Sequence, residues 1–203
     1  MESDNYKTIR SSSEGIYKEK GSKFLSFAFP VGSQEEIKPL IEGIRKEYHD
    51  ARHHCYAYMI GRDRLIWRIN DDGEPSGTAG RPILGQINSF GLTNILIVVS
   101  RYFGGTLLGV SGLINAYKTA AANAIRNSEI IERTLHEYYK IDFPYISMND
   151  VMKILKEENA GQSGQSFELE CSVFINFKVS AREKIVSRLS RIEGLKYKYL
   201  ETR

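Results

Sequence analysis

The sequence has few cysteines and no long apolar run, which excludes several classes of protein. Its two cysteines, Cys55 and Cys171, lie far apart and form no metal-binding or redox spacing, so we expect no disulfide framework. The longest aliphatic run covers residues 95–99, whereas a membrane-spanning helix needs about 20 residues. The chain begins with MESDNYKTIR, which contains no apolar signal core. These absences predict a cytoplasmic protein without a membrane segment.

The chain is long enough to fold without a stabilising metal or disulfide. Its 203 residues correspond to one large or two small domains. Hydrophobic residues make up 41% of the chain and charged residues 26%, a balance that is typical of globular proteins and too apolar for disorder. We therefore expect a hydrophobic core of ordinary size.

Basic residues are unevenly distributed, although the net charge of +3 is too small to indicate a nucleic-acid-binding protein. Residues 52–126 contain eight basic and four acidic side chains, and seven of those eight are arginines. Arginine presents a planar fork that pairs with phosphate or carboxylate through two hydrogen bonds, which lysine does not. This segment indicates either an anion-binding face or a set of solvated strand and helix surfaces.

Residues 1–130 are predicted to form a first domain. The expected elements are strands at residues 8–12, 14–18 and 23–30, a helix at 33–48, a hairpin at 52–60 and 64–70, a loop at 70–82, a short helix at 82–90, a buried strand at 94–100 and a long helix at 109–127. Ser33 is the expected N-cap of the first helix, with Glu36 completing a capping box. Trp67 stands between Leu65 and Ile69 on one strand face and is expected in the core, whereas Arg64 and Arg68 occupy the opposite face.

Residues 131–203 are predicted to form a second domain. The expected elements are a strand at residues 135–143, a helix at 147–158 with Ser147 as its cap, strands at 164–170 and 171–179, a helix at 181–192 and a strand at 195–200. This βαββαβ order is that of the ferredoxin-like fold, which closes on its own core. The fold class is therefore α+β, with two domains.

A glycine turn (residues 104–109) follows the buried strand and opens the long helix. Such a turn can bind an anion, because glycines bring backbone N–H groups close to a ligand and a helix start carries partial positive charge. It is not a nucleotide-binding Walker A loop, since Val110 stands where lysine is needed. A tight turn with close helix packing is the alternative.

A second irregular segment, which we call the motif loop (residues 71–81), is rich in acidic and small residues. Asp71, Asp72 and Glu74 invite a metal interpretation, but the calcium-loop register fails because Ala79 stands where a bidentate acid is required. An Asp-Asp-Gly turn more often caps its own backbone. His53 and Cys55 supply too few ligands for zinc and do not form a supported nucleophile pair. We expect no metal, no cofactor and no identifiable catalytic residue.

Aromatic residues lie among the arginines of the same segment. They are Tyr56, Tyr58, Trp67, Tyr102 and Phe103. Aromatic and basic side chains together suit single-stranded or looped RNA, because bases stack on the rings and phosphates pair with the cations. Core packing is the alternative for each ring.

Three stretches resemble the IMPACT family in its bacterial YigZ branch. They are ARHHCYAY at residues 51–58, DDGEPSGTAGRP at residues 71–82 and VVSRYFGGTLLG at residues 98–109. The resemblance covers residues 1–127, and the second domain resembles the carboxy-terminal domain of that branch. It implies a two-layer α/β first domain, like the domain-2 fold of a small-subunit ribosomal protein and domain IV of elongation factor G. The ferredoxin-like second domain would resemble domain V of that factor.

The resemblance implies no established enzymatic reaction. Eukaryotic relatives carry an amino-terminal RWD domain and regulate translation under amino-acid stress by competing for a kinase activator. We expect no such segment in this chain, so that partner is not carried over. RNA or the translation machinery is the expected partner, with no membrane and no obligatory metal.

Two functional hypotheses follow. The favoured one is a non-enzymatic RNA- or ribosome-associated translation or stress regulator, with an arginine-rich face formed by Arg52, His54, Arg68, Arg81, Arg101, Gly104, Gly105 and Lys118. The alternative is a small-molecule or phosphate-ester enzyme with its site between the glycine turn and the motif loop, whose named residues are Asp71, Asp72, Glu74, Ser76 and Thr78. The motif loop is structural instead if Glu74 and Arg101 are buried partners of each other.

Overall fold

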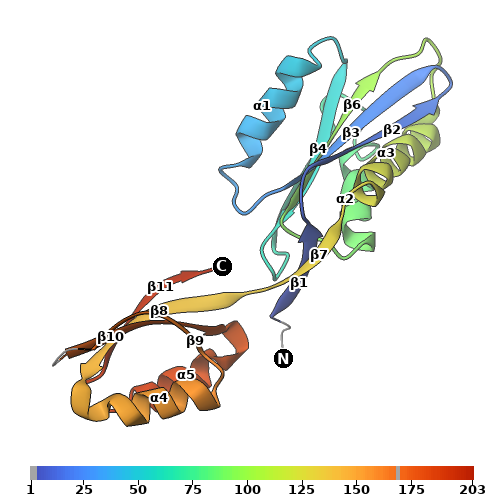
Figure 1. The fold of residues 1–203 in the computed structure, drawn as a ribbon. Helices are drawn as coiled ribbons and strands as arrows, with labels where there is room; N and C mark the ends of the chain where they lie inside the picture. Colours follow the sequence, from blue (N-terminus) through green and yellow to red (C-terminus); the bar gives the residue numbers. More distant parts are fainter. Residues whose placement is uncertain (1–3, 168–169) are drawn as a thin grey trace. The chain divides into compact units, whose positions relative to one another are not determined.

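A computed structural model describes residues 4–167 and 170–203 (Figure 1). The chain divides into two compact units. The first unit is Tyr6–Arg133, and the second is Thr134–Arg203 together with Asp4 and Asn5. Each unit contains hydrophobic clusters of its own. Across the described ranges, no helix is both long and apolar enough to span a membrane.

The first unit is built on a five-stranded antiparallel sheet. Its strands lie in the order β2 (Ser13–Glu19), β3 (Ser22–Pro30), β6 (Ile95–Tyr102), β4 (His53–Ile60) and β5 (Ile66–Asn70). The central strand β6 is buried from Ile95 to Val99, as its uninterrupted aliphatic run predicts. A strand with no polar alternation needs helices on both faces of its sheet.

Helices supply that cover (Figure 1). α1 (Ile37–Glu47) packs on one face of the sheet, and α2 (Gly80–Ser89) and α3 (Gly109–Arg126) pack on the other. Because neighbouring strand residues point to opposite faces, Leu96 and Val98 belong to the cluster under α1. Ile97 and Val99 belong to the cluster under α2 and α3.

The first helix starts later than its sequence pattern predicts. α1 begins at Ile37, and Ser33 is not its N-cap. Pro39 explains the difference, because proline has no N–H to donate and is tolerated only in the first turn of a helix. Half of the expected capping box survives in the preceding turn, where Oε1 of Glu36 accepts the backbone N–H of Gly32 and of Ser33, each at 3.0 Å.

A separate two-stranded sheet pairs β1 (Asn5–Ile9) with β7 (Ile130–Thr134). The sequence pattern predicts the first strand later, at residues 8–12, and predicts no strand at β7. These strands lie far apart in the chain, so their pairing is a tertiary contact that local patterning does not report.

The second unit has the predicted βαββαβ element order. It comprises β8 (His136–Pro144), α4 (Met148–Glu157), β9 (Gly161–Phe167), β10 (Glu170–Lys178), α5 (Arg182–Leu189) and β11 (Lys196–Thr202). The sheet order is β11-β8-β10-β9 with antiparallel neighbours, which confirms the ferredoxin-like topology. Ser147 precedes α4, but its side chain makes no cap hydrogen bond. Residues 168 and 169 of the strand predicted at 164–170 lie outside the described residues.

Candidate functional site

The Asp71 carboxylate accepts backbone hydrogen bonds from other residues of the motif loop. One carboxylate oxygen accepts the N–H groups of Ala79 and Gly80 at 3.0 and 2.8 Å, and the other accepts that of Gly77 at 2.8 Å. Ala79 and Gly80 stand at the start of α2, whose N–H groups have no partner inside the helix. Asp71 therefore caps α2 from a distance.

Asp72 ties the motif loop to β4 and to α1. Its carboxylate accepts the backbone N–H of His54 and the Arg45 guanidinium, both at 2.7 Å. Its carbonyl oxygen lies 2.8 Å from Nδ1 of His53. Because a carbonyl only accepts hydrogen bonds, Nδ1 carries the proton. Nε2 of His53 then faces the Glu74 carboxylate, 3.9 Å away.

Glu74 lies beneath the motif loop with its side chain only 3% exposed. Its Oε1 accepts hydrogen bonds from Nη1 of Arg101 at 2.6 Å and from the hydroxyl of Tyr117 at 2.8 Å. The structure therefore makes Glu74 and Arg101 buried partners, the arrangement in which the motif is structural. Arg101 is not free to bind a phosphate on the surface, and among the described residues its Nε has no hydrogen-bond partner.

Cys55 and Tyr117 also belong to this polar cluster, and both are buried. The Cys55 thiol donates to the carbonyl of Asp71 at 3.0 Å and lies 3.4 Å from the Tyr117 hydroxyl. Burial raises the pKa of both groups, so both remain protonated. Nucleophilic catalysis needs a thiolate, and a buried neutral thiol does not supply one. In the described residues, no three His, Cys, Asp or Glu side chains gather as a metal site.

The remaining motif-loop residues divide between the surface and the interior. Ser76 is exposed. Thr78 is buried, and its hydroxyl donates to the carbonyl of Pro75 at 2.6 Å. The loop is thus held by its own hydrogen bonds.

A motif pocket of about 380 Å³ lies between the motif loop and the glycine turn. Its lining residues are Arg52, His53, Gly73, Glu74, Pro75, Arg101, Phe103, Leu107, Leu108, Gly109, Val110 and Leu113. The polar side chains are Arg52 just before β4, His53 on β4, Glu74 in the motif loop and Arg101 on β6, and the apolar wall comes from the glycine turn and the start of α3. Gly104 itself packs against the β2–β3 turn, since an added Cβ would lie 1.9 Å from the carbonyl carbon of Gly21. Gly105 has a φ of +85°, which only glycine adopts readily.

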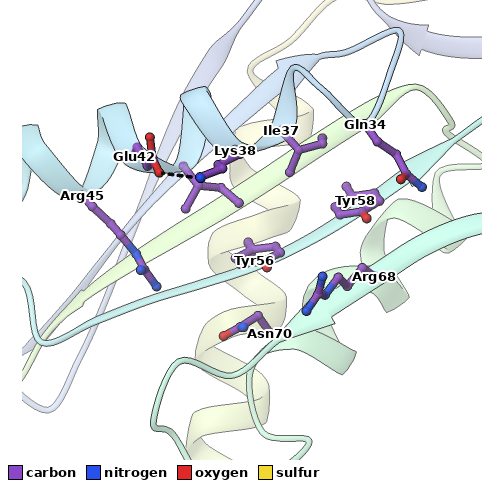
Figure 2. Close-up of a pocket in the computed structure, with 10 residues that line it drawn as sticks. Gln34, Ile37, Lys38, Glu42, Arg45, Tyr56, Tyr58, Arg68 and Asn70 are labelled. Atoms are coloured by element: carbon purple, nitrogen blue, oxygen red, sulfur yellow. Dashed lines mark ion pairs between the residues drawn. The ribbon is translucent and has the colours of Figure 1, made fainter.

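A second cavity, the α1 groove, opens between α1 and strands β4 and β5 (Figure 2). Its volume is about 460 Å³, and it is lined by Gln34, Ile37, Lys38, Ile41, Glu42, Arg45, Tyr56, Tyr58, Arg68 and Asn70. Tyr56 pairs with Asn70 and Tyr58 with Arg68 in the β4–β5 register. Because directly paired residues share a sheet face, two aromatic rings, a guanidinium and an amide line one wall. Among the described residues Arg68 has no hydrogen-bond or ionic partner.

The structure does not form the single arginine-rich face predicted from the sequence. Arg68 and His54 lie on the α1 side of the sheet, whereas Arg101 lies on the other side and is buried. The exposed Arg81 and Lys118 belong to α2 and α3, which cover that other side. Arg52 is exposed just before β4 and lines the motif pocket. Strand alternation and helix placement separate residues that are close in sequence.

His54 also differs from its predicted role in anion binding. It is 7% exposed, and its Nδ1 lies 2.8 Å from the Ser100 hydroxyl. Burial lowers the pKa of His54, and Arg45 and His53 act in the same direction, while Asp72 opposes them. A neutral, buried imidazole does not bind phosphate from solvent.

Two other sequence expectations about this hairpin need correction. Trp67 is 54% exposed rather than in the core, because β5 is the edge strand of the sheet. Arg64 precedes β5 in a turn with a φ of +58° and donates to the side chain of Asn88 at 2.6 Å. Gln34, Lys38 and Arg45 also line the groove and were not predicted as site residues. Helix periodicity does not tell which strands a helix will face.

Comparisons with known proteins agree on one family. The family of Impact N-terminal domains matches residues 20–125. YvyE of Bacillus subtilis, an IMPACT family member, is 34% identical over 75% of this chain and 70% of its own length. An IMPACT family member of Haemophilus influenzae is 33% identical over 84% of each chain. The IMPACT family member YigZ of Escherichia coli is 36% identical over 67% of this chain and 68% of its own.

A solved structure extends the similarity to the fold of both units. It is a crystal structure described as that of a hypothetical protein, 27% identical, with a TM-score of 0.69 over 99% of this chain and 98% of the other. The fold and the motif loop define a two-unit α+β protein with an Impact N-terminal domain. The chain belongs to the IMPACT family, in its bacterial, YigZ-like form.

Proposed function

We propose that this protein is an RNA-binding, translation-associated regulator that uses the α1 groove to hold a single-stranded or looped segment of RNA. The observation that carries this proposal is the β4–β5 wall, where the half-buried Tyr56 lies opposite Asn70 and the buried Tyr58 lies opposite Arg68. Arg68 is exposed and has no hydrogen-bond or ionic partner among the described residues. RNA loops are recognised by stacking on aromatic rings, by pairing of phosphates with arginine and by hydrogen bonds to base edges.

The charges around the groove support the same proposal. Arg45 is bound to Asp72 across 2.7 Å, and Lys38 lies 3.8 Å from Glu42. Arg45 and Lys38 are therefore each compensated by a carboxylate. Arg68 has no acidic partner among the described residues, so its guanidinium is available to pair with a phosphate. Arg45 also connects the groove to the motif loop, so the loop helps to position the groove.

The partner expected for this role is ribosomal RNA or another component of translation in the cytoplasm. The proposal includes two further expectations. The first is that the two units are similar to domains IV and V of elongation factor G. The second is a role under stress, which the family resemblance implies for eukaryotic relatives. Neither the likeness to those domains nor a role under stress requires a catalytic site.

Co-sedimentation with ribosomes and fluorescence anisotropy with labelled RNA, each over a salt series, test the proposal. Arg68→Ala is compared with Arg126→Ala, which removes the same charge from the far side of the sheet on α3. We expect Arg68→Ala to weaken binding by roughly tenfold and to lower the salt slope by about one, since one phosphate contact is lost. Equal binding by the two variants, or no binding by the wild type at low salt, would overturn the proposal.

The motif pocket favours a second candidate function, a site for a small anionic ligand such as a phosphate ester. Among the described residues, the Arg52 guanidinium at the pocket has no partner and the buried Arg101 Nε is unpaired. The adjacent start of α3 has no side-chain cap. NMR titration with inorganic phosphate and with nucleoside monophosphates tests it. Saturable shifts confined to the pocket support this candidate, whereas shifts at the α1 groove alone contradict it.

A further inference from the structure

The helices described in the second unit, α4 and α5, both lie on one face of its sheet (Figure 1). On β8 and β10, alternate residues such as Ile141 and Val173 are buried against α4 and α5. The intervening residues point to the opposite face, over which the described part of the second unit places no helix (Figure 1). We call this the platform face; its residues on the two central strands are His136, Tyr138, Lys140, Asp142 and Pro144 on β8, and Glu170, Ser172, Phe174, Asn176 and Lys178 on β10.

Two aromatic rings stand on the central strands of the platform face. Tyr138 lies on β8 opposite Asn176, and Phe174 lies on β10 opposite Lys140. Phe174 is 40% exposed although it occupies an interior strand. Gly164 on β9 makes room for its ring, since an added Cβ would lie 2.7 Å from Cδ2 of Phe174. The Phe174 ring thus packs against Gly164 on β9 while remaining outside the hydrophobic core.

The Tyr138 ring already accepts a planar cationic partner. The Arg203 guanidinium carbon lies 4.3 Å from its centroid. Guanidinium and nucleobase planes use the same face of an aromatic ring. Arg203 also lies 3.4 Å from the Glu201 carboxylate. A base that stacks on Tyr138 would displace the guanidinium from the ring.

On β8, β10 and β11 the platform face carries four lysines (Lys140, Lys178, Lys196 and Lys198) and three acidic residues (Asp142, Glu170 and Glu201). Two of the lysines face each other. Lys198 on β11 lies directly opposite Lys140 on β8, and like charges in that position are destabilising. Lys140 is compensated by Asp142, 3.0 Å from its Nζ. Lys198 has no partner among the described residues. An anion bound over this pair would remove the repulsion.

We propose that the platform face binds single-stranded RNA, with bases stacked on Tyr138 and Phe174 and phosphates paired with Lys140 and Lys198. Aromatic rings on the two central strands of a four-stranded βαββαβ sheet, flanked by cations, are the arrangement that stacks successive bases. A protein partner fits less well, because lysine is depleted at protein interfaces. This inference rests on the proposed RNA-binding function and adds a second RNA surface to it.

Fluorescence anisotropy of the full chain with a 12-nucleotide single-stranded RNA tests the inference. Phe174→Ala should weaken binding roughly 5- to 150-fold, since one stacked base is worth about 1–3 kcal/mol. Phe174→Tyr preserves stacking and should stay within about twofold of the wild type. Ile146→Ala, which truncates an apolar side chain that is 90% exposed outside the platform face, is the matched control. Thermal unfolding of every variant verifies folding.

Comparison with the α1-groove variant separates the two proposals. If Arg68→Ala weakens RNA binding and folded Phe174→Ala does not, the platform inference is overturned while the proposed function stands. If Phe174→Ala weakens binding and Arg68→Ala does not, the platform is supported and the α1 groove is not the site. Absence of RNA binding by the wild type, or a Phe174→Ala effect on a protein partner alone, overturns the platform inference.

Discussion

The Arg101 guanidinium donates a 2.6 Å hydrogen bond from Nη1 to Oε1 of Glu74, and both side chains are at least 93% buried. This pair joins the motif loop to the central strand β6. A buried ion pair contributes little net stability compared with apolar residues of the same volume, but removal of one partner leaves an uncompensated charge in the interior. The pair therefore makes the position of the loop dependent on both residues at once.

The first prediction follows from that dependence. Glu74→Ala should lower the free energy of unfolding by roughly 3–5 kcal/mol, because Arg101 is left buried and unpaired. The double variant Glu74→Leu/Arg101→Met should be less destabilised than Glu74→Ala alone. Urea denaturation measures both values. A single variant within about 1 kcal/mol of the wild type would mean that water or a rearranged side chain compensates Arg101.

The second prediction concerns the cap supplied by Asp71. Asp71→Ala removes three hydrogen bonds to the loop and to the start of α2. We expect a loss of about 2 kcal/mol, at the upper end of N-cap effects. Hydrogen exchange resolved by NMR should show faster exchange at the amides of Gly77, Ala79 and Gly80. Unchanged protection at these amides would show that the loop holds its shape without the carboxylate.

The third prediction concerns pH. Burial lowers the pKa of His54 in the folded chain, so near its ordinary value the unfolded chain binds the proton more readily. Stability therefore increases with pH through this range, and the His54 contribution is lost as pH falls from about 7 toward the folded-state pKa. Unfolding free energies between pH 5 and 7.5 should fall less steeply with acid for His54→Gln than for the wild type. Identical slopes would contradict the buried, neutral imidazole.

The fourth prediction separates a glycine required by packing from one that is not. Gly104→Ala places a Cβ 1.9 Å from the Gly21 carbonyl carbon, so we expect a loss of about 2 kcal/mol or more. Gly85→Ala lies within α2, where an added Cβ meets nothing within 4 Å. That variant should gain up to about 1 kcal/mol from helix propensity. Thermal unfolding of both variants checks the contrast, and equal melting temperatures would contradict it.

Local patterning was most successful where one element decides the outcome. The aliphatic run at residues 95–99 predicts a strand covered on both faces, and the strand predicted at residues 135–143 corresponds to β8. The same logic failed at Ser33, where the pattern of apolar residues was correct but Pro39 moved the start of the helix. It also failed at Trp67, since an edge position depends on which strands pair.

The candidate sites required contacts between distant parts of the chain. The register of the β4–β5 hairpin places Tyr58 opposite Arg68. The groove exists only because α1 packs over that face of the sheet, and this packing is a tertiary contact. Phe174 and Lys198 share the platform face because β10 and β11 both pair with β8. Neither arrangement is visible in a window of neighbouring residues.

By itself the sequence determined the family, the two-part α+β organisation and the order of elements in the second unit, because periodicity and short motifs are local properties of the chain. The tertiary structure alone decided which basic residues are free and which are buried. It assigned Arg101 to the interior, Arg68 to a groove and Lys118 to the far side of the sheet. The physical reason is that strand alternation and non-local pairing send neighbouring residues to opposite faces, where different helices cover them.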